Sequence, residues 1–449
     1  AAPPHLLRSA GPPEAARALE AALFAQWCPS RTARHPLGGF YKYPAALRPQ
    51  AARELLSLLP PGRLLDPFCG SGGSLLEALI SGRSAIGNDS SPLALFVALH
   101  QTLRPQAEWA EGLRRAAREV ADKVRAQRKA AHLAAAVAAA KAAEAAADAA
   151  AKGKPAPPTP KRARSGRHLQ WQALATHVRE AEARMAQDDS LIVWSQGQKP
   201  TPLWFCLAVA IQRAAHDKTE PPTLLVETVD EYCNGTEILE SLAPSSTLPP
   251  PLLIHSDART LERARAGGSI DAILTSPPYP GVYDYLSLAR EERTRLAMRS
   301  RSGGRSRKAR GARLTAGGAV AGGEEQGGPA LMGLDAVPIG RSWPEGWRSE
   351  HEMGARKARR RRPDVFARDW QRDQEAWLAA ARRCLRSGGM AAIVIGDGDG
   401  IDTLESTCMA AEAVGLELSA SATISSNLPA GMRAEGNRRT EHAILLRAP

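Results

Sequence analysis

Short apolar runs that end in turn residues alternate with helical patterns in the first 100 residues and again from residue 250 onward. Residues 63–66 and 271–276 are two such runs, and each predicts a buried strand that leads directly into a turn. Strands that alternate with helices predict a sheet of the α/β class. Strands are predicted in this way at residues 63–66, 84–87, 252–257, 271–276, 390–396, 416–424 and 441–447, and helices at 14–28, 49–59, 74–80, from about 92, and at 259–266, 281–299, 369–386 and 402–414.

The middle of the chain follows a different pattern. Large apolar residues become rare across 105–165, and the Ala/Lys/Glu-rich residues 129–152 predict a protruding helix with little surface to bury. Residues 153–164 read as a Pro-rich basic linker. After this linker the pattern regains Trp, Leu and Val and predicts a buried helix at 203–215 and a strand at 223–229. We therefore expect an inserted, mostly helical lobe.

Positive charge is concentrated in one irregular segment. The chain carries a net charge of +12 and has a pI of about 9.7. Residues 301–362 hold 14 Lys/Arg and 6 Asp/Glu, a net of +8, with little periodicity, which predicts a segment that is mobile without a ligand. A basic balance points to a polyanionic partner, nucleic acid first. The alternative is a basic surface insertion that binds nothing.

These patterns divide the chain into five segments. Two of them, the insertion and the basic segment, interrupt a core that is discontinuous in sequence. The predicted segments are the N-terminal part of the core at 1–100, the insertion at 101–250, the continued core at 251–300, the basic segment at 301–362 and the C-terminal part of the core at 363–449.

The remaining composition excludes several classes of protein. Six scattered cysteines form no CxxC pair, which argues against a metal site or a disulfide framework and favours a reducing compartment. No apolar run approaches the roughly 18 residues of a membrane span, and the first residues lack a signal-peptide pattern. We expect an intracellular protein without a membrane or metal partner, in the cytoplasm and nucleoid, or in the nucleus if the source is eukaryotic.

A tandem-proline turn follows the strand predicted at 271–276. Two prolines fix φ at successive positions and remove two N–H donors, so their carbonyls are held facing outward. The hydroxyl of Ser276, the carbonyl of Pro277 and the ring of Tyr279 then lie at the carboxyl end of a strand, where open α/β sheets bind ligands. Such a site can hold a flat ring that carries an amino group. Taken alone, the same residues also fit a simple Pro-rich turn.

A glycine-rich turn follows the strand predicted at 63–66. The turn, Pro67-Phe-Cys-Gly-Ser-Gly-Gly, precedes the N-terminus of a helix and predicts a nucleotide-like pocket. Asp89 lies about 20 residues on, where an acidic residue meets ribose hydroxyls. The alternative for Asp89 is an N-cap of the helix near Pro92. The aromatic, Gly- and Pro-containing stretch 35–49 fits either a ligand lid or a surface loop.

Together, the two turns resemble a known family. Asp66-Pro-Phe-Cys-Gly-Ser-Gly and Thr275-Ser-Pro-Pro-Tyr, in this order and on predicted strands, are similar to the S-adenosylmethionine (SAM)-dependent amino-methyltransferases of DNA, the N4-cytosine/N6-adenine group. Tyr43-Pro44 resembles the family's N-terminal SAM-side motif. The resemblance implies a Rossmann-like, seven-stranded class I methyltransferase sheet with a helical insertion and a basic irregular segment. It covers about 31–100, 250–300 and 365–448.

The resemblance also implies a role for each matching residue. Asp66 would lie by the methionine amino group of SAM, Asp89 would bind the ribose hydroxyls and Asp257 would approach the adenine ring. The full set implied to bind SAM is Tyr43, Pro44, Asp66, Phe68, Cys69, Gly70, Gly72, Asp89, Asp257 and Thr275. The residues implied in catalysis are Ser276, Pro277, Pro278 and Tyr279.

In the implied reaction, Ser276 and Pro277 receive the target amine, and Tyr279 stacks on a base flipped out of the duplex. Within the family, Ser before Pro-Pro favours N4 of cytosine, whereas Asp or Asn favours N6 of adenine. We therefore expect a DNA methyltransferase specific for N4 of cytosine. The alternatives are an N6-adenine enzyme, an RNA amino-methyltransferase and, in a different class, a catalytically inactive DNA-binding module.

Two regions bear on the DNA partner. The basic segment 300–362 is expected to follow DNA phosphates. The insertion lies between the second and third predicted strands, whereas members of the family more often place their target-recognition region after the third or fourth strand. Its part in target recognition is therefore left open.

Overall fold

The structure is a computed structural model of the 449-residue chain. It describes residues 5–27, 37–44, 46–104, 107–152, 166–185, 201–243, 248–261, 270–285, 352–427 and 438–449. Most of the predicted helices at 281–299 and 259–266, the linker at 153–164 and most of the basic segment lie outside these residues. No helix within the described ranges has the length and apolar character needed to cross a membrane.

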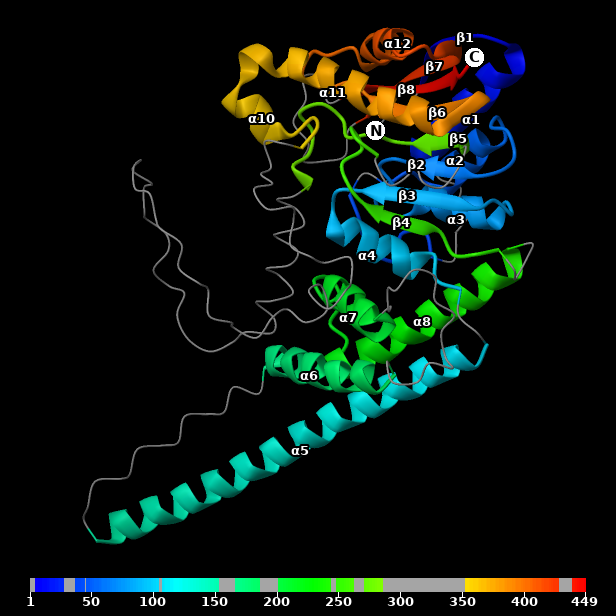
Figure 1. Cartoon of the computed structure of the whole chain (residues 1–449). Helices are drawn as coiled ribbons and strands as arrows, with labels where there is room; N and C mark the ends of the chain where they lie inside the picture. Colours follow the sequence, from blue (N-terminus) through cyan, green and yellow to red (C-terminus); the bar gives the residue numbers. More distant parts are fainter. Residues whose placement is uncertain are drawn as a thin grey trace.

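A single mixed sheet forms the centre of the protein (Figure 1). Its strand order is β1-β7-β8-β6-β5-β2-β3-β4. The strands from β6 to β4 run parallel, and β8 lies antiparallel between β6 and β7. This is a Rossmann-like, class I methyltransferase sheet of the α/β class, as predicted. The strands are β1 (His5–Ala10), β2 (Leu64–Asp66), β3 (Ala85–Asp89), β4 (Leu252–His255), β5 (Ile270–Thr275), β6 (Leu385–Gly396), β7 (Glu417–Asn427) and β8 (Arg438–Arg447).

Among the described residues the sheet has eight strands, one more than the seven that were predicted. Strand β1 joins the edge of the sheet through antiparallel pairing with β7, where Ser9 lies opposite Ala422. All six of its residues are exposed, so it shows none of the buried periodicity by which a strand is recognised in sequence. Backbone hydrogen bonds to β7, rather than burial of its side chains, define this strand.

Helices cover both faces of the sheet, because alternate strand residues point in opposite directions. Leu64 packs with the helices from the first quarter of the chain, and Leu65 packs with α11 and α12. Prolines at the first turns of α2, α4 and α11 suit helix starts, where the missing N–H is not needed. The covering helices are α1 (Pro13–Trp27), α2 (Pro49–Leu56), α3 (Gly73–Ile80), α4 (Pro92–Gln101), α11 (Pro363–Cys384) and α12 (Thr403–Ala413).

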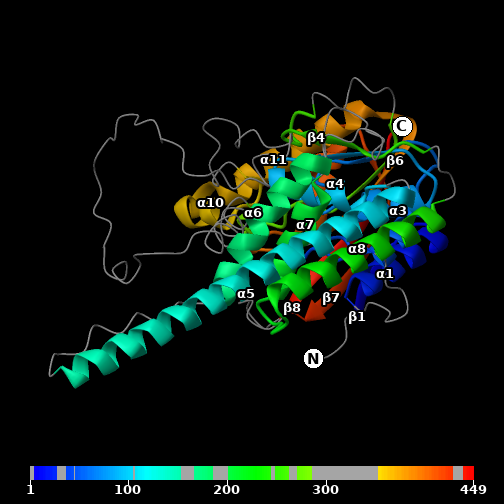
Figure 2. The same ribbon diagram turned by 90° about the horizontal axis from the view of Figure 1, so that it is seen from below.

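In the described part of residues 101–250, four helices form the inserted lobe, in which α5 and α8 lie side by side (Figures 1 and 2). They are α5 (Ala107–Ala151), α6 (Arg167–Met185), α7 (Pro202–Arg213) and α8 (Pro221–Leu242). The first half of α5 buries a stripe that includes Trp109, Leu113 and Val120, so the expectation of little burial from residue 105 is wrong for this half. The second half protrudes as predicted, and Leu133 on it is 67% exposed.

The strand predicted at 223–229 is wrong, because these residues lie inside α8. A short apolar run such as Thr-Leu-Leu-Val does not by itself distinguish a buried strand from a buried helix. Helical spacing continues beyond the run through the buried residues Val229, Cys233 and Thr236. Pro221 at the first turn starts this helix.

The prediction of an irregular basic segment is wrong near its C-terminal end, where Arg356–Arg361 form the helix α10.

His100 joins the lobe to the sheet. Its ring stacks on Phe205 of α7 with centroids 4.8 Å apart, and its Nε2 accepts from the backbone N–H of Thr201 at 3.0 Å. The hydroxyl of Tyr232 in α8 donates to the backbone carbonyl of His100 at 2.6 Å. One fully buried imidazole therefore contacts both α7 and the segment that precedes it.

Burial of His100 predicts a pH dependence of folding. It lowers the pKa of the imidazole from 6.5 to about 4, so the folded protein keeps this side chain neutral where the unfolded chain protonates it. The unfolded state then binds the extra proton. The free energy of unfolding should fall by about 3 kcal/mol as the pH drops from about 7 to about 4. Urea titrations across this range measure the loss.

The control for this prediction is His100→Gln, which keeps an acceptor near Thr201 but cannot titrate. Subtracting the variant's unfolding free energy from that of the wild type removes the contributions of other titrating groups. The stability advantage of the wild type should shrink as the pH falls. A difference that stays constant over this range would contradict the prediction.

Candidate functional site

The two predicted turns meet at the carboxyl end of neighbouring strands. Strands β2 and β5 pair in parallel, with Leu64 opposite Ala272 and Leu65 opposite Ile273. The hydroxyl of Thr275 donates to Oδ1 of Asp66 at 2.6 Å, so the last residues of the two strands are in direct contact. The glycine turn and the tandem-proline turn consequently open on the same side of the sheet.

Both turns line one pocket. Among the predicted residues, those in its lining are Tyr43, Pro44, Phe68, Gly70, Asp89, Asp257, Ser276 and Pro278. The predicted residues that lie behind or beside this lining are Asp66, Cys69, Gly72, Thr275, Pro277 and Tyr279. Residues predicted to bind the methyl donor and residues predicted to bind the target amine thus face the same pocket.

The glycine turn leaves room over its backbone. Gly70 has φ of +51°, and a Cβ placed on it would lie 3.5 Å from the ring of Tyr43. Gly72, with φ of +85°, is the N-cap of α3. Both residues adopt the left-handed region that glycine tolerates. Cys69 is buried behind the turn, where its Sγ would lie 3.0 Å from a Cβ on Gly87.

Asp89 lies at the end of β3 and lines the pocket. Its Oδ2 accepts from the backbone N–H of Gly70 at 2.9 Å, and its Oδ1 accepts from that of Ser91 at 2.7 Å. Burial raises the pKa of this carboxyl to about 6. The N-cap of α4 is Ser91, whose Oγ accepts from Ala94 N–H at 3.3 Å, so the alternative that Asp89 caps this helix is wrong.

Asp66 links the two turns through the hydrogen bonds of its buried carboxylate. Its carboxylate accepts from the hydroxyls of Ser74 and Thr275 and from the backbone N–H of Phe68. It is only 3% exposed, and burial raises its pKa to about 6. These donors come from α3, β5 and the glycine turn. The role beside a methionine amino group stays a prediction.

Arg259 fixes Asp257, and two carboxylates offset its positive charge. Its guanidinium makes a bidentate contact with Asp257, with Nη2 to Oδ2 at 2.6 Å, and reaches Asp373 of α11 at 3.0 Å. Two carboxylates therefore share one guanidinium.

The charges around the pocket favour a cation. Asp89, Asp257 and Glu352 line it, and the positive charge of Arg259 in the lining is matched by Asp257 and Asp373. A phosphate group entering this space would meet carboxylates, whereas a positively charged group would be attracted. The pocket thus suits a cationic ligand with a sugar or ring system better than a nucleotide phosphate.

Part of the lining comes from residues that the sequence did not single out. Tyr285, Glu352 and Met353 complete the wall on the side of the tandem-proline turn. The carbonyl of Gly354 accepts from Gly281 N–H at 2.9 Å, and a Cβ on Gly354 would lie 2.8 Å from Trp370. In the sequence, the one signal for this part of the wall was Gly354. It could not be distinguished from the other glycines of a Gly-rich segment.

Tyr279 is enclosed rather than open to the pocket. It is 8% exposed, and a Cβ on Gly396 would lie 2.8 Å from its ring. The guanidinium of Arg439 lies 4.9 Å from the ring centroid. A base could stack on the ring face that Arg439 covers only if Arg439 moved away. The predicted stacking role of Tyr279 stays a prediction.

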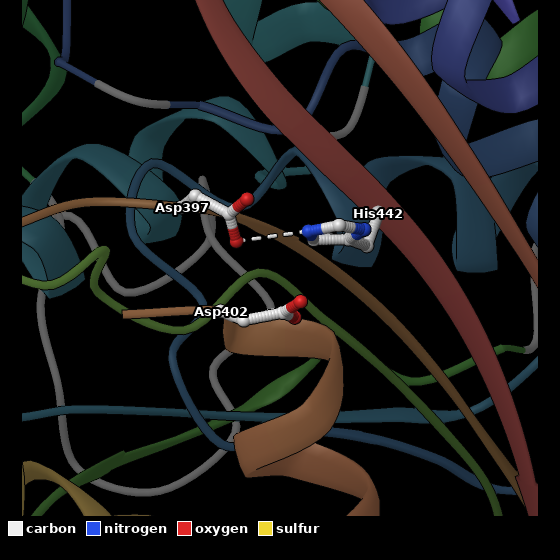
Figure 3. A group of neighbouring side chains, drawn as sticks. All are labelled: Asp397, Asp402 and His442. Atoms are coloured by element: carbon white, nitrogen blue, oxygen red, sulfur yellow. Dashed lines mark hydrogen bonds and ion pairs between the residues drawn. The ribbon is translucent and has the colours of Figure 1, made fainter. Parts of the chain in front are cut away.

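A second group of ionisable side chains lies at the end of β6 (Figure 3). Ligand-type atoms of Asp397, Asp402 and His442 lie within 4.8 Å of one another. Asp397 Oδ1 accepts from Thr403 N–H and pairs with His442 Nε2, both at 2.9 Å, while His442 Nδ1 pairs with the Thr423 hydroxyl. Burial would raise the pKa of Asp397, but these hydrogen bonds lower it. The bonds account for the arrangement as a link between α12 and the sheet.

The model of the UPF0020 family, described as an RMKL-like methyltransferase domain, matches residues 40–153, about a quarter of the chain. No curated protein matches. Two structures of the rRNA methyltransferase aviRa from Streptomyces viridochromogenes are 12% and 14% identical, with TM-scores of 0.32 and 0.30. They cover 92% and 93% of this chain, and 94% and 93% of theirs. Likenesses at these scores carry no argument about function.

The domain match and the fold agree. The matched region contains Tyr43, the glycine turn and Asp89, which are the residues on the predicted SAM side of the pocket. The sheet has the class I methyltransferase strand order. The match and the strand order together support a methyltransferase, for which SAM is the implied methyl donor.

Proposed function

We propose that this protein transfers a methyl group from SAM to the exocyclic amine of a nucleic-acid base, with N4 of cytosine in DNA as the target. One observation carries the proposal: Ser276 of the tandem-proline turn lines the same pocket as Gly70 and Asp89. An acceptor group for an amine and a cradle for a cationic cofactor therefore share one space.

The residues of the pocket fit SAM. Gly70 leaves its backbone open beneath the Tyr43 ring, Asp89 retains lone pairs for ribose hydroxyls, and Arg259 holds Asp257 in place. The acidic lining matches the net positive charge of the cofactor. When bound, SAM supplies an electrophilic methyl group on a sulfonium centre. A dinucleotide would fit this site poorly. Its phosphates would meet carboxylates, and the arginine in the lining is already paired with Asp257 and Asp373.

The tandem-proline turn suits the activation of an amine. The lone pair of an exocyclic amine is delocalised into the base, so the amine must be rotated before it can attack. The Ser276 hydroxyl and the carbonyl of Pro277 can accept the two amine hydrogens, and the prolines hold these acceptors rigid. Correct positioning of the two reacting atoms then supplies much of the rate.

A basic surface lies close to this pocket. Glu352 and Met353 line the pocket, and α10 with its exposed arginines begins three residues further on. The backbone N–H of Lys357 donates to Asp284 at 2.9 Å, which attaches α10 to the segment after the tandem-proline turn. Positive side chains here can contact the phosphates that flank a target base. The choice of cytosine in DNA rests on Ser276 at the head of the turn.

Substitution at the two turns should separate chemistry from cofactor binding. Ser276→Ala removes an acceptor for the amine and should lower kcat on the order of 100-fold, because misplaced reacting atoms cost rate. The affinity for SAM, measured by calorimetry, should stay unchanged, because Ser276 is not among the residues predicted to bind SAM. Ser241→Ala, on the exposed surface of α8, is the matched control and should keep full activity. Equal loss of SAM affinity and activity in Ser276→Ala would contradict the assignment.

Asp89 should give SAM binding a pH dependence. Its pKa is raised to about 6, and a cation beside it favours the ionised form. The affinity for SAM should therefore weaken about tenfold as the pH falls from about 7.5 to about 5. Asp89→Asn should bind weakly and lose most of this dependence, whereas Asp364→Asn at the start of α11 should retain it. Calorimetry at several pH values decides, and wild-type affinity in Asp89→Asn would contradict the pocket assignment.

The methylated product tests the choice of target. The full chain is incubated with radiolabelled SAM and either genomic DNA or total RNA from cells that lack the protein, and the nucleosides are then identified by mass spectrometry. N4-methylcytosine in DNA is the expected product. Label in RNA alone, or N6-methyladenine in DNA, would overturn the cytosine-in-DNA target. An absence of label from both nucleic acids would overturn the proposed function.

A further inference from the structure

Two tyrosines near the tandem-proline turn differ in what they face. Tyr285 lines the pocket together with Ser276 and Pro278, whereas Tyr279 is not part of the lining. Tyr279 is buried at 8% exposure, while Tyr285 is partly exposed. Of these two rings, it is therefore that of Tyr285 that borders the space next to Ser276.

The space beside Tyr279 is occupied by the protein itself. The Arg439 guanidinium lies 4.9 Å from the Tyr279 ring centroid, and a Cβ on Gly396 would lie 2.8 Å from the ring. Arg439 is held in turn, because its Nη2 donates to Glu441 at 2.7 Å and its guanidinium lies 5.4 Å from the Trp27 ring. A base that stacked on this face would have to separate a buried ion pair, which is costly.

The segment that carries Tyr285 is attached to α10. The backbone N–H of Lys357 donates to Oδ1 of Asp284 at 2.9 Å, and that of Arg356 donates to the carbonyl of Tyr283 at 3.3 Å. The rings of Tyr283 and Tyr285 lie with their centroids 5.4 Å apart and their planes tilted by 46°. Aromatic rings attract one another at this separation. Tyr285 is therefore positioned by its backbone neighbours and by an aromatic partner.

The wall around Tyr285 suits a flat ring with an amino group. Pro278 and Met353 add apolar surface to the same lining, and Glu352 adds a carboxylate. An aromatic side chain stacks on the face of any base, and a carboxylate can accept from the amino group of cytosine. This part of the pocket thus offers a stacking surface and polar acceptors close to Ser276.

We propose that Tyr285 provides the ring on which the target base stacks while its amine faces Ser276. This inference rests on the proposed function, in which Ser276 and Pro277 receive the amine, and it adds the residue that holds the base. Stacking on Tyr285 offsets part of the cost of taking the base out of the duplex. Tyr279 then supports the turn through its contacts with Arg439 and β6.

Substitutions at Tyr285 should separate its ring from its hydroxyl. Tyr285→Phe keeps the ring and should retain kcat/KM for DNA within about threefold, whereas Tyr285→Ala should lower it roughly 10- to 100-fold, the range expected for loss of one base–aromatic stack. Initial rates with genomic DNA and saturating radiolabelled SAM measure the effect. Tyr283→Leu is the matched control, because Tyr283 lies in the same segment but outside the pocket lining, and it should change kcat/KM only a few-fold.

A photochemical cross-link detects the contact without turnover. Genomic DNA amplified with 5-iodocytosine in place of cytosine is irradiated with the full chain and S-adenosylhomocysteine, and mass spectrometry of the digested protein identifies the attached residue. Transcripts that contain 5-iodocytidine replace the DNA if RNA is the labelled substrate. Attachment is expected at Tyr285 and should be lost in Tyr285→Ala. This readout uses the wild type, so it holds even if Tyr285→Ala proves unstable.

Three outcomes would overturn the stacking role of Tyr285. They are attachment at Tyr279 instead of Tyr285, wild-type kcat/KM in Tyr285→Ala, and a Tyr285→Phe variant as impaired as Tyr285→Ala. If the wild type methylates neither nucleic acid, the proposed function fails and the stacking role fails with it. If the wild type methylates its substrate but gives no attachment at Tyr285, only the stacking role fails.

Discussion

The contact between the ends of β2 and β5 is the constraint on which the rest of the site depends. Asp66 accepts hydrogen bonds from Ser74, Thr275 and Phe68, which belong to α3, β5 and the glycine turn. A buried carboxylate is costly unless such donors satisfy it, so the three elements are held in one arrangement. This arrangement brings a turn suited to a cofactor and a turn suited to an amine into one pocket.

Negative charge lies in the pocket, and positive charge lies on the surface beside it. Carboxylates line the pocket, and the arginine among them is matched by Asp257 and Asp373. Exposed arginines of α10 lie outside it, on a segment attached to the tandem-proline turn. A cationic cofactor and a polyanionic substrate would therefore be attracted to separate but adjacent surfaces. Neither surface would compete with the other for its ligand.

Burial acts in the same direction on three carboxyls near the turns. It raises the pKa values of Asp66, Asp89 and Glu441. Perturbed carboxyls gather at functional sites, because desolvation there changes how readily a group holds or accepts a proton. Asp66 has a structural task, Asp89 faces the pocket, and Glu441 lies behind Tyr279. The same physical effect thus acts on a carboxyl that holds the two turns together and on one that faces the pocket.

The sequence by itself determined the local elements and the two turns. The glycine turn, the prolines after Ser276 and the acid at Asp89 are short-range patterns, and their predicted positions at strand ends are where the structure has them. Short-range patterns were insufficient for 223–229, which is apolar enough for a strand or a helix and becomes part of α8. They were also insufficient for β1, which is defined by hydrogen bonds to β7 alone.

Only the tertiary structure brought Glu352, Arg439 and Glu441 to the turns. No spacing in the sequence relates these residues to Ser276 or Tyr279, because their contacts arise from the order of strands in the sheet and from a segment that returns over the turn. Local sequence fixes the conformation of a few neighbouring residues. The partners of a buried side chain depend instead on which distant strands and helices pack beside it.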